Sequence, residues 1–538
     1  MSVDTNNAAF QDALNLIQYT RQSVFLTGKA GTGKSTFLRY VCEHTKKKHV
    51  VLAPTGIAAI NAGGSTMHSF FKLPFYPLLP DDPNLSLQRG RIHEFFKYTK
   101  PHRKLLEQIE LVIIDEISMV RADLIDAIDR ILRVYSHNLR EPFGGKQLLL
   151  VGDVFQLEPV VKNDEREILN RAYPTPYFFS ARVFSQIDLV SIELQKVYRQ
   201  TDSVFVSVLD HIRTNTAGAA DLQLLNTRYG SHIEESEADM YITLATRRDT
   251  VDSINEKKLA ELAGEPITFE GSIEGDFPES SLPTSQELVL KPGAQIIFIK
   301  NDFDRRWVNG TIGVIAGIDE EEETIYVITD DGKECDVKRE SWRNIRYRYN
   351  EKTKEIEEEV LGSFTQYPIR LAWAITVHKS QGLTFSRVVI DFTGGVFAGG
   401  QAYVALSRCT SLDGIQLKKP INRADIFVRP EIVNFAGRFN DRQAIDKALK
   451  QAQADVQYAA AARAFDKGDM EECLEQFFRA IHSRYDIEKP VPRRLIRRKL
   501  GIINTLQEQN KKLKEQMREQ QERLRQYAHE YLLMGNEC

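Results

Sequence analysis

Eight residues near the start of the chain, GKAGTGKS at positions 28–35, constrain its fold more than any other feature. They match the pattern G-x-x-x-x-G-K-[ST], in which a glycine-rich backbone wraps a phosphate at the start of a helix. The apolar run at 24–26 is typical of a buried strand, and residues 36–41 are typical of a helix. This order predicts a nucleotide-binding α/β domain, in preference to a glycine-rich turn without function.

The loop and two later strand ends supply residues suited to the hydrolysis of a nucleoside triphosphate. We expect the Lys34 ammonium group to reach the outer phosphates and the Ser35 hydroxyl to bind Mg²⁺. The apolar run at 111–114 ends in Asp115, predicted to hold Mg²⁺, and Glu116, predicted to orient and deprotonate the attacking water. A strand followed by acidic residues is common, but about 80 residues after such a loop the pattern indicates an NTPase.

A third strand, predicted at 147–151, is followed by a turn that contains Gln156. Its neutral amide can both donate and accept hydrogen bonds, so it can bridge a γ-phosphate to a moving partner. Taken alone, this segment fits a plain structural turn better.

Short apolar runs alternate with helix-length segments over residues 1–180, which predicts a parallel sheet covered on both faces. The proline-rich stretch at 73–83 interrupts this pattern, so we interpret 66–105 as an insertion that acts as a wedge. A second α/β pattern covers 181–263 and 365–435, and the short β-like runs between its halves, at 264–364, predict a small inserted barrel.

Residues 436–538 are helical and polar in pattern, and their last part repeats in sevens. Two positions of the repeat are occupied by Ile503, Asn510, Met517, Leu524 and Tyr531, and by Leu506, Leu513, Gln520 and Tyr527. This pattern over 503–531 predicts a coiled coil through which chains self-associate, with a single helix packed on the enzyme as an equal alternative. The basic run at 489–499 suits a nucleic-acid backbone, although such runs are more often solvated surface.

The composition narrows the class of protein. A net charge of −4 argues against a nucleic-acid coat protein but allows a confined basic channel. The five cysteines form no C-x-x-C pair, so we expect no disulfide frame or zinc site and a reducing cytoplasm. No apolar run reaches the roughly 18 residues of a membrane span.

Seven blocks occur in a fixed order: GKAGTGKST, APTGIAA, IIDEISM, VGDVFQLEPV, VYRQ, AITVHKSQGLT and YVALSRC. This series resembles superfamily-one helicases, and most of all the PIF-type (petite integration frequency) DNA helicases and their RecD relatives, over about residues 10–430. The segment DHIR at 210–213 resembles part of the PIF-type signature region. The resemblance implies two RecA-like domains, an inserted Src-homology-three-like barrel, and 5′-to-3′ movement on single-stranded DNA.

Site residues carry over from this resemblance by position. Arg199 and Arg408 would reach the γ-phosphate from the second domain, although surface ion pairing is the commoner role of an arginine. Gln11 would contact adenine, an assignment for which Gln18 and Gln22 lie close enough to compete. The residues expected to bind ATP are Gln11, Gly28, Ala30, Gly31, Thr32, Gly33, Lys34, Ser35, Thr36 and Gly382.

The same resemblance assigns contacts to the DNA backbone, which carry no sequence information. The residues expected to make them are Pro54, Thr55, Gly56, His68, Ser69, Phe70, Thr376, His378 and Lys379. The aromatic residues Phe70, Phe71, Phe75 and Tyr76 suit base stacking or, more readily, a small core of the insertion.

These observations predict an ATP-dependent DNA helicase that uses Mg²⁺ and acts on single-stranded and on forked or structured DNA. We expect a monomeric core in the cytoplasm, associated with the nucleoid if the cell is bacterial. The alternatives are an RNA helicase, which only a contact to the 2′-hydroxyl would reveal, and an ATP-gated scaffold that works through its coiled-coil tail.

Overall fold

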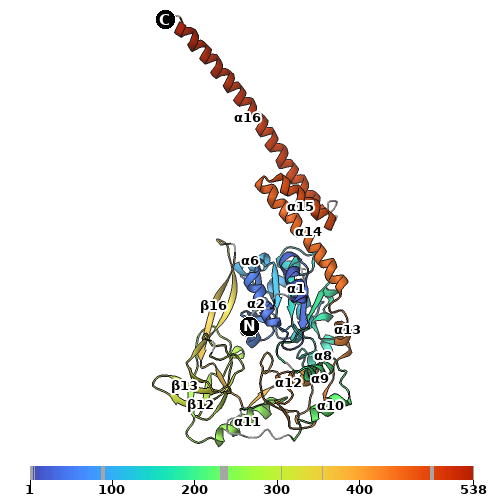
Figure 1. The fold of residues 1–538 in the computed structure, drawn as a ribbon, viewed down its shortest axis with the longest axis vertical. Helices are drawn as coiled ribbons and strands as arrows, with labels where there is room; N and C mark the ends of the chain where they lie inside the picture. Colours follow the sequence, from blue (N-terminus) through green and yellow to red (C-terminus); the bar gives the residue numbers. More distant parts are fainter. Residues whose placement is uncertain are drawn as a thin grey trace. The chain divides into compact units, whose positions relative to one another are not determined.

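The computed structural model describes residues 4, 7–86, 91–200, 202–230, 240–304, 306–353, 355–484 and 490–536 (Figure 1). The chain divides into two compact units, Met1–Ala448 and Leu449–Cys538. Among the described helices, none is long and apolar enough to cross a membrane.

The first domain is a six-stranded parallel sheet in the order β3-β2-β4-β5-β1-β6. Its central strands are runs of Val, Ile and Leu because helices cover both faces of the sheet. The strands are β1 (Val24–Gly28), β2 (His49–Ala53), β3 (Ser65–Thr66), β4 (Leu111–Ile114), β5 (Gln147–Val151) and β6 (Val190–Leu194). The helices are α1 (Ala8–Tyr19), α2 (Lys34–His44), α3 (Gly56–Ala62), α4 (Met67–Phe71), α5 (Arg91–Phe95), α6 (Lys100–Gln108), α7 (Ala122–Tyr135) and α8 (Asn163–Asn170).

Strand β6 places the end of the first sheet beyond the predicted boundary at residue 180. It pairs in parallel with β1, with Val24 opposite Val190 and Gly28 opposite Leu194. A sequence pattern assigns a strand but not its partner, so β6 was grouped with the second domain. Its true place puts the chain that follows β6 directly beside the phosphate loop at the end of β1.

The second domain is a four-stranded parallel sheet in the order β18-β7-β19-β20. Its strands are β7 (Ile242–Ala245), β18 (Ala374–Thr376), β19 (Val388–Asp391) and β20 (Ile415–Leu417). Its helices are α9 (Ser203–Arg213), α10 (Ala219–Asn226), α11 (Arg248–Glu261) and α12 (Gln401–Leu406), whereas α13 (Pro430–Ala436) returns to pack on the core of the first domain. Two parallel sheets with a β insertion confirm the predicted fold class.

The inserted β region divides among three antiparallel sheets. The largest, in the order β14-β13-β12-β11-β17, contains β11 (Gln295–Phe298), β12 (Ile312–Asp319), β13 (Thr324–Thr329), β14 (Glu334–Val337) and β17 (Ile369–Leu371). The other two contain β15 (Glu340–Asn350), β16 (Glu355–Gln366) and β9 (Ser272–Gly275), and β8 (Ile267–Glu270) and β10 (Glu287–Leu290). Because β17 pairs with β11, the inserted region continues past the predicted boundary at residue 364.

The long hairpin of β15 and β16 contacts the first domain, where β15 lies against α6 (Figure 1). Tyr347 and Tyr349 of β15 are buried in the core of the first domain. The Val51 backbone N–H donates to the Tyr347 hydroxyl at 3.3 Å. A strand far along the sequence thus anchors the inserted region to the first sheet.

The insertion at 66–105 packs its inner side chains into the core of the first domain and has an exposed tip. Phe70 and Phe71 are buried, with their rings edge to face at 4.8 Å. Phe75 and Tyr76, in contrast, are 83% and 49% exposed. The core interpretation is therefore correct for the first pair, whereas the second pair presents aromatic rings to solvent.

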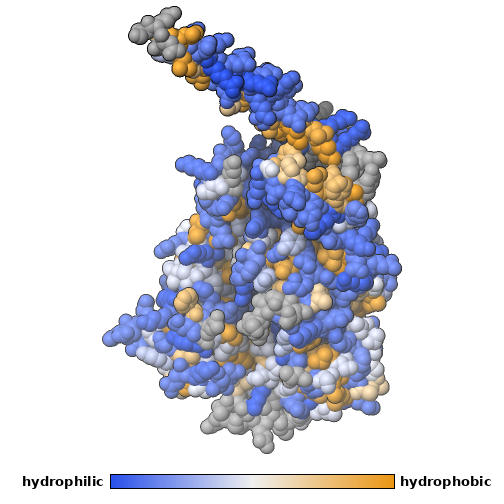
Figure 2. Space-filling view, turned by 45° about the horizontal axis from the view of Figure 1, so that its top comes forward, coloured by the Kyte–Doolittle hydropathy of each residue, from blue (hydrophilic) through white to orange (hydrophobic). Residues whose placement is uncertain are grey.

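The second unit consists of helices. In α14 (Arg442–Lys467) and α15 (Met470–Ser483), Tyr458 and Phe477 meet edge to face at 5.9 Å, which agrees with the predicted helical hairpin. Helix α16 (Pro490–Asn536) is 47 residues long. Figure 2 shows a mostly hydrophilic face of the molecule, with hydrophobic side chains in small groups.

Candidate nucleotide and DNA site

The phosphate loop joins β1 to α2 and lies against residues that follow β6. Gly31 has a left-handed backbone (φ 80°), and a Cβ there would lie 2.5 Å from the Cβ of Arg199. Only glycine fits so close an approach. The Lys34 Nζ donates to the carbonyl oxygens of Gly28 at 2.6 Å and Lys29 at 3.0 Å. Lys34 thus lies over its own loop, and burial lowers its pKa while Asp153 opposes that shift.

Two carboxylates stand at the end of β4. The Asp115 Oδ1 accepts from the Glu116 backbone N–H at 2.9 Å, and Glu116 adopts a left-handed backbone (φ 50°) that is strained for this residue. Burial, followed by the charge of Asp115, raises the pKa of Glu116 to about 7. Burial also raises the pKa of Asp115. A carboxylate with a pKa near neutrality is suited to accept a proton from water.

Two arginines face this group, Arg199 from the segment that follows β6 and Arg408 from the second domain. Arg408, 1% exposed, follows α12, and its Nε donates to the Val404 carbonyl at 3.0 Å. Arg199 donates to the carbonyls of Ser407 at 3.3 Å and Gly382 at 3.4 Å. Backbone acceptors therefore hold both guanidinium groups in place, with no carboxylate in hydrogen-bonding distance in the described contacts.

Burial is the main cause that lowers the pKa of each arginine, to about 9 for Arg408, where the charge of Arg199 contributes further. Lys34 and Arg199 are thus half-buried cations and Arg408 a fully buried one, and each interacts unfavourably with the others or with its surroundings. A triphosphate carries the negative charge that offsets this cost, so the residues fit an anionic nucleotide.

The oxygen donors of Ser35 and Asp115 suit Mg²⁺, which prefers few protein ligands together with water and phosphate oxygens. In the described part of the chain, no cluster of three or more His, Cys, Asp or Glu side chains is placed to hold a metal on its own. Ser35 and Asp115 offer a hydroxyl and a carboxylate oxygen for such an ion.

The second domain contacts three successive residues of the loop, which sequence reasoning did not identify. The Tyr198 backbone N–H donates to the Gly31 carbonyl at 2.9 Å, and the Ala30 N–H donates to the Tyr403 hydroxyl at 3.0 Å. Lys29 forms an ion pair with Asp210. In the sequence, Tyr198 directly precedes Arg199 in VYRQ, and Tyr403 lies in YVALSRC together with Arg408. This proximity to the predicted arginines is the signal by which the sequence could have indicated the two tyrosines.

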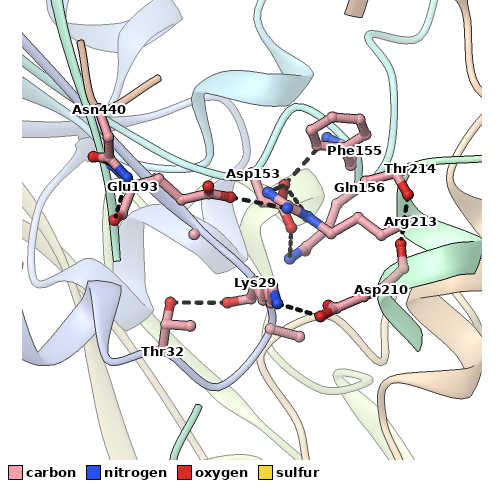
Figure 3. A network of polar contacts seen from close by, with 12 residues as sticks. Lys29, Thr32, Asp153, Phe155, Gln156, Glu193, Asp210, Arg213, Thr214 and Asn440 are labelled. Carbon is pink, nitrogen blue, oxygen red and sulfur yellow. Dashed lines mark hydrogen bonds and ion pairs between the residues drawn. The ribbon is translucent and has the colours of Figure 1, made fainter. Parts of the chain in front are cut away.

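The turn after β5 forms a network with α9 (Figure 3). The Gln156 Nε2 donates to the Asp153 carboxylate at 3.3 Å, and Arg213 forms an ion pair with the same carboxylate at 3.0 Å. A Cβ on Gly400, which precedes α12, would lie 2.3 Å from the Gln156 carbonyl. The predicted γ-phosphate residue thus lies at the contact between the two domains.

Gln11 lies in the first turn of α1, close in sequence to a segment that reaches the loop. Asp4 pairs with Lys196 at 2.7 Å and accepts from the Tyr198 hydroxyl at 2.9 Å. Of the competing glutamines, Gln22 donates hydrogen bonds from its side-chain amide to the backbone carbonyls of Ser23 and Asp188. Gln11 therefore remains our proposed adenine contact.

The predicted DNA contacts lie at the ends of β2, β3 and β18. Thr55, Thr66 and Thr376 each accept, through the side-chain hydroxyl, a backbone N–H three residues ahead at 3.2 Å. Capped turns of this kind present further N–H groups to a phosphate. Residues Pro54, Ser69 and Lys379 lie beside these caps, and burial lowers the pKa of Lys379.

The structure bears on three of the DNA predictions. The Phe70 side chain is 3% exposed and packs in the first core, so it is not available to a base. A Cβ on Gly56 would lie 2.5 Å from the Ser281 hydroxyl, so the inserted region covers the start of α3. His68 instead stacks on exposed Phe75 at 5.0 Å, and burial lowers the pKa of His68.

The His378 imidazole shares the electrostatic character of His68, since burial lowers its pKa as well. Both rings are therefore neutral at neutral pH, and each would donate one N–H to a phosphate without adding charge.

The comparisons with known proteins agree with this geometry. Residues 4–217 match the model of the family described as "PIF1-like helicase". An "ATP-dependent DNA helicase Pif1" from Campylobacter jejuni is 33% identical over 412 residues, which cover 73% of this chain and 88% of the relative. A human "ATP-dependent DNA helicase PIF1" is also 33% identical, and the match covers 74% of this chain and 58% of that protein.

Among solved structures, a Bacteroides sp Pif1 in complex with ADP-AlF4 matches with a TM-score of 0.74 and 41% identity, covering 81% of this chain and 97% of that one. A Bacteroides Pif1 bound to single-stranded DNA matches with a TM-score of 0.59 and 40% identity, covering 82% and 99%. The chain belongs to the PIF1-like helicases.

Proposed function

We propose that this chain is an ATP-dependent DNA helicase whose hydrolytic site is completed by closure of two RecA-like domains. One observation carries the proposal: Lys34 and Glu116 come from the first sheet, whereas Arg199 and Arg408 come from segments beyond it. Neither group is complete without the other. This arrangement makes hydrolysis sensitive to how the domains lie around a strand.

Each residue has a separate task in the proposed reaction. Glu116 orients a water molecule and takes its proton, for which its pKa of about 7 is suitable. Lys34 gives up its hydrogen bonds to the Gly28 and Lys29 carbonyls and contacts the outer phosphates. Gln156 forms hydrogen bonds that link the γ-phosphate to the second domain. Arg199 and Arg408 stabilise the charge that develops on the transferred phosphoryl group.

Ser35 and Asp115 would hold Mg²⁺, which supplies charge neutralisation and orientation of the phosphates when bound. The remaining ATP contacts would be backbone N–H groups of the loop from Gly28 to Thr36. Gly382 of the second domain, whose carbonyl accepts a hydrogen bond from Arg199, would contact the nucleotide from the opposite side.

The DNA strand would lie across the capped turns of both domains, so each domain holds the backbone in turn. Thr55 and His68 grip from the first domain, and Thr376, His378 and Lys379 from the second. Alternating grip during closure and opening gives directed stepping, which we assign the 5′-to-3′ direction on the basis of the family resemblance. Such an activity belongs in the cytoplasm, with the nucleoid if the cell is bacterial.

Unwinding of forked substrates tests the proposal. Duplexes with a 5′ or a 3′ single-stranded tail, made of DNA or of RNA, should be compared at saturating ATP and Mg²⁺. We expect unwinding of the DNA duplex with a 5′ tail. A preference for RNA would support an RNA helicase instead, and ATP hydrolysis that single-stranded DNA does not stimulate would contradict a helicase of either kind.

We further propose that α16 pairs with α16 of a second copy. The side chains of the seven-residue repeat are exposed along the helix, among them Leu506 at 55%, Leu524 at 67% and Tyr531 at 78%. Gln507, Gln509, Gln516 and Gln521 flank the repeat, so neutral side chains border much of the contact between identical helices. Asn510 within the repeat suits a two-stranded coiled coil in register.

The mass of the full chain in solution tests this pairing, measured by light scattering against a chain that lacks residues 500–538. We expect a dimer for the first and a monomer for the second. The full-length variant Leu513→Lys should also be monomeric, because it places a charge in the apolar contact. A monomeric full chain would contradict the pairing and favour a single helix.

A further inference from the structure

Helix α9 carries two opposite charges three residues apart, at Asp210 and Arg213. Residues with this spacing are neighbours on a helix surface. The apolar side of the same helix, with Phe205, Val208 and Ile212, is buried in the core of the second domain. The helix therefore moves with the second domain while its charged side meets the first.

Asp210 holds the phosphate loop through Lys29 (Figure 3). The pair is partly exposed, with 25% of the Lys29 and 32% of the Asp210 side chain accessible. The Lys29 carbonyl in turn accepts from the Lys34 Nζ at 3.0 Å and from the Thr32 hydroxyl at 2.9 Å. A shift of Lys29 would therefore move an acceptor that fixes Lys34.

Arg213 holds the turn after β5. It forms ion pairs with Asp153 at 3.0 Å and Glu193 at 2.9 Å, and its guanidinium lies 4.4 Å from the centre of the Phe155 ring. Asp153 also accepts from Gln156, the proposed γ-phosphate contact. One face of α9 thus reaches both first-domain segments that would surround the γ-phosphate.

Each charged residue of α9 lies opposite a first-domain side chain of the opposite sign. The acidic residue of α9 meets a lysine, and the basic residue meets two acidic side chains. A displacement of α9 along the first domain would break these pairs together, so the contact specifies one position of the helix.

We propose that α9 transmits the position of the second domain to the nucleotide loop, with Asp210 as a positioning residue that acts through Lys29. This inference rests on the proposed function, since it explains how DNA held by both domains would alter ATP turnover. When a strand draws the second domain into a new position, α9 pulls on Lys29 and thereby on the carbonyl that holds Lys34.

A double-mutant cycle on the full chain tests the inference. The variants are Asp210→Asn, Lys29→Gln and both together, and the quantities are KM for ATP and kcat with and without single-stranded DNA. We expect each single change to reduce the stimulation of kcat by DNA about fivefold or more, the lower end of coupling between sites. The double variant should be no worse than either single variant, because one interaction is lost in all three.

A charge exchange and a matched control sharpen the test. Lys29→Asp combined with Asp210→Lys should recover much of the stimulation, whereas each of these changes alone brings two like charges together. Lys258→Gln removes a different lysine–carboxylate pair, the exposed contact with Glu261 in α11, and should have no effect. Arg213 is unsuited to the test, since its removal would leave the buried Asp153 carboxylate without its ionic partner and endanger folding.

The outcomes separate this inference from the proposed function. If DNA stimulates ATP hydrolysis by the wild type and by Asp210→Asn to the same extent, the role of α9 is overturned but the proposed function stands. Strictly additive effects of the two single changes on this stimulation would have the same meaning. A loss of thermal stability without a change in stimulation would show a structural role only and also overturn it. Absence of stimulation in the wild type would overturn both proposals.

Discussion

The two walls of the nucleotide site differ in how the chain builds them. The first wall consists of short segments directly after β1 and β4, where the phosphate loop and Asp115–Glu116 follow apolar strands. The second wall gathers Arg199, Gly382 and Arg408 from segments far apart in the sequence, and backbone carbonyls hold its arginines. Local geometry thus places the first wall, whereas tertiary packing places the second.

From this difference we expect the first wall to bind the nucleotide and the second wall to set the rate of hydrolysis. The first wall contains the proposed base, Glu116, and the proposed phosphate-binding residue, Lys34, so it should bind nucleotide by itself. The second wall adds only positive charge and contacts to the loop, so it should affect the rate far more than the binding of nucleotide. Changes in either wall test this division.

Lys34→Ala should reduce ATP hydrolysis to the background rate, because it removes the side chain that contacts the outer phosphates. The variant should remain folded, since burial of the Lys34 charge is itself unfavourable. Steady-state hydrolysis with single-stranded DNA and a thermal melt check both points. Exposed Lys46 offers a matched Lys46→Ala control, and turnover that survives in Lys34→Ala would refute the site.

Arg408→Ala should lower kcat about 10³-fold, as expected for an arginine that stabilises a transferred phosphoryl group. Binding of a fluorescent ADP analogue should persist, because the first wall is intact. Arg423→Ala, which removes a surface arginine bonded to Asn215, serves as the control. Loss of analogue binding in parallel with kcat would mean that the walls do not divide binding and rate as we describe.

The pH dependence should reveal the base of the first wall. Burial raises the pKa of Glu116 to about 7, and only the ionised form accepts a proton, so kcat should fall as the pH falls through about 7. Between pH 8 and pH 6 the ionised fraction changes about tenfold, and kcat should follow it. Glu116→Gln should have a low kcat that does not fall further as the pH falls through about 7. A midpoint of the wild-type pH profile between pH 4 and 5, about the usual range of a glutamate, would exclude Glu116 as the base.

Phe75→Ala should have the smallest effect, a loss of about fivefold in affinity for single-stranded DNA, typical of one stacked base. Phe75 is exposed and stacked with His68, beside the first-domain caps. Fluorescence anisotropy with a labelled oligonucleotide measures the change. Phe303→Ala, which removes a ring that is 97% exposed, is the control, and equal affinities for all three proteins would exclude stacking at the tip of the insertion.

The positions of the first-wall residues could be predicted from the sequence, because each stands next to a strand or a helix. The sequence assigned Arg199 and Arg408 only through resemblance, and it did not identify Tyr403 or the Lys29–Asp210 pair, since no local pattern reports contacts across 181 or more residues. Phe70 was wrong as a DNA contact because a run of aromatic residues does not reveal which rings point into a core. Strand β6 was misplaced for the same reason: pairing is a tertiary property.

The central claim is that closure of the second wall makes hydrolysis depend on DNA, and Arg199→Ala tests it most directly. Hydrolysis should be measured for the wild type and for this variant, each with and without saturating single-stranded DNA. We predict strong stimulation of the wild type and a slow rate in the variant that DNA does not increase. A variant that is slower but stimulated by the same factor as the wild type would contradict the account.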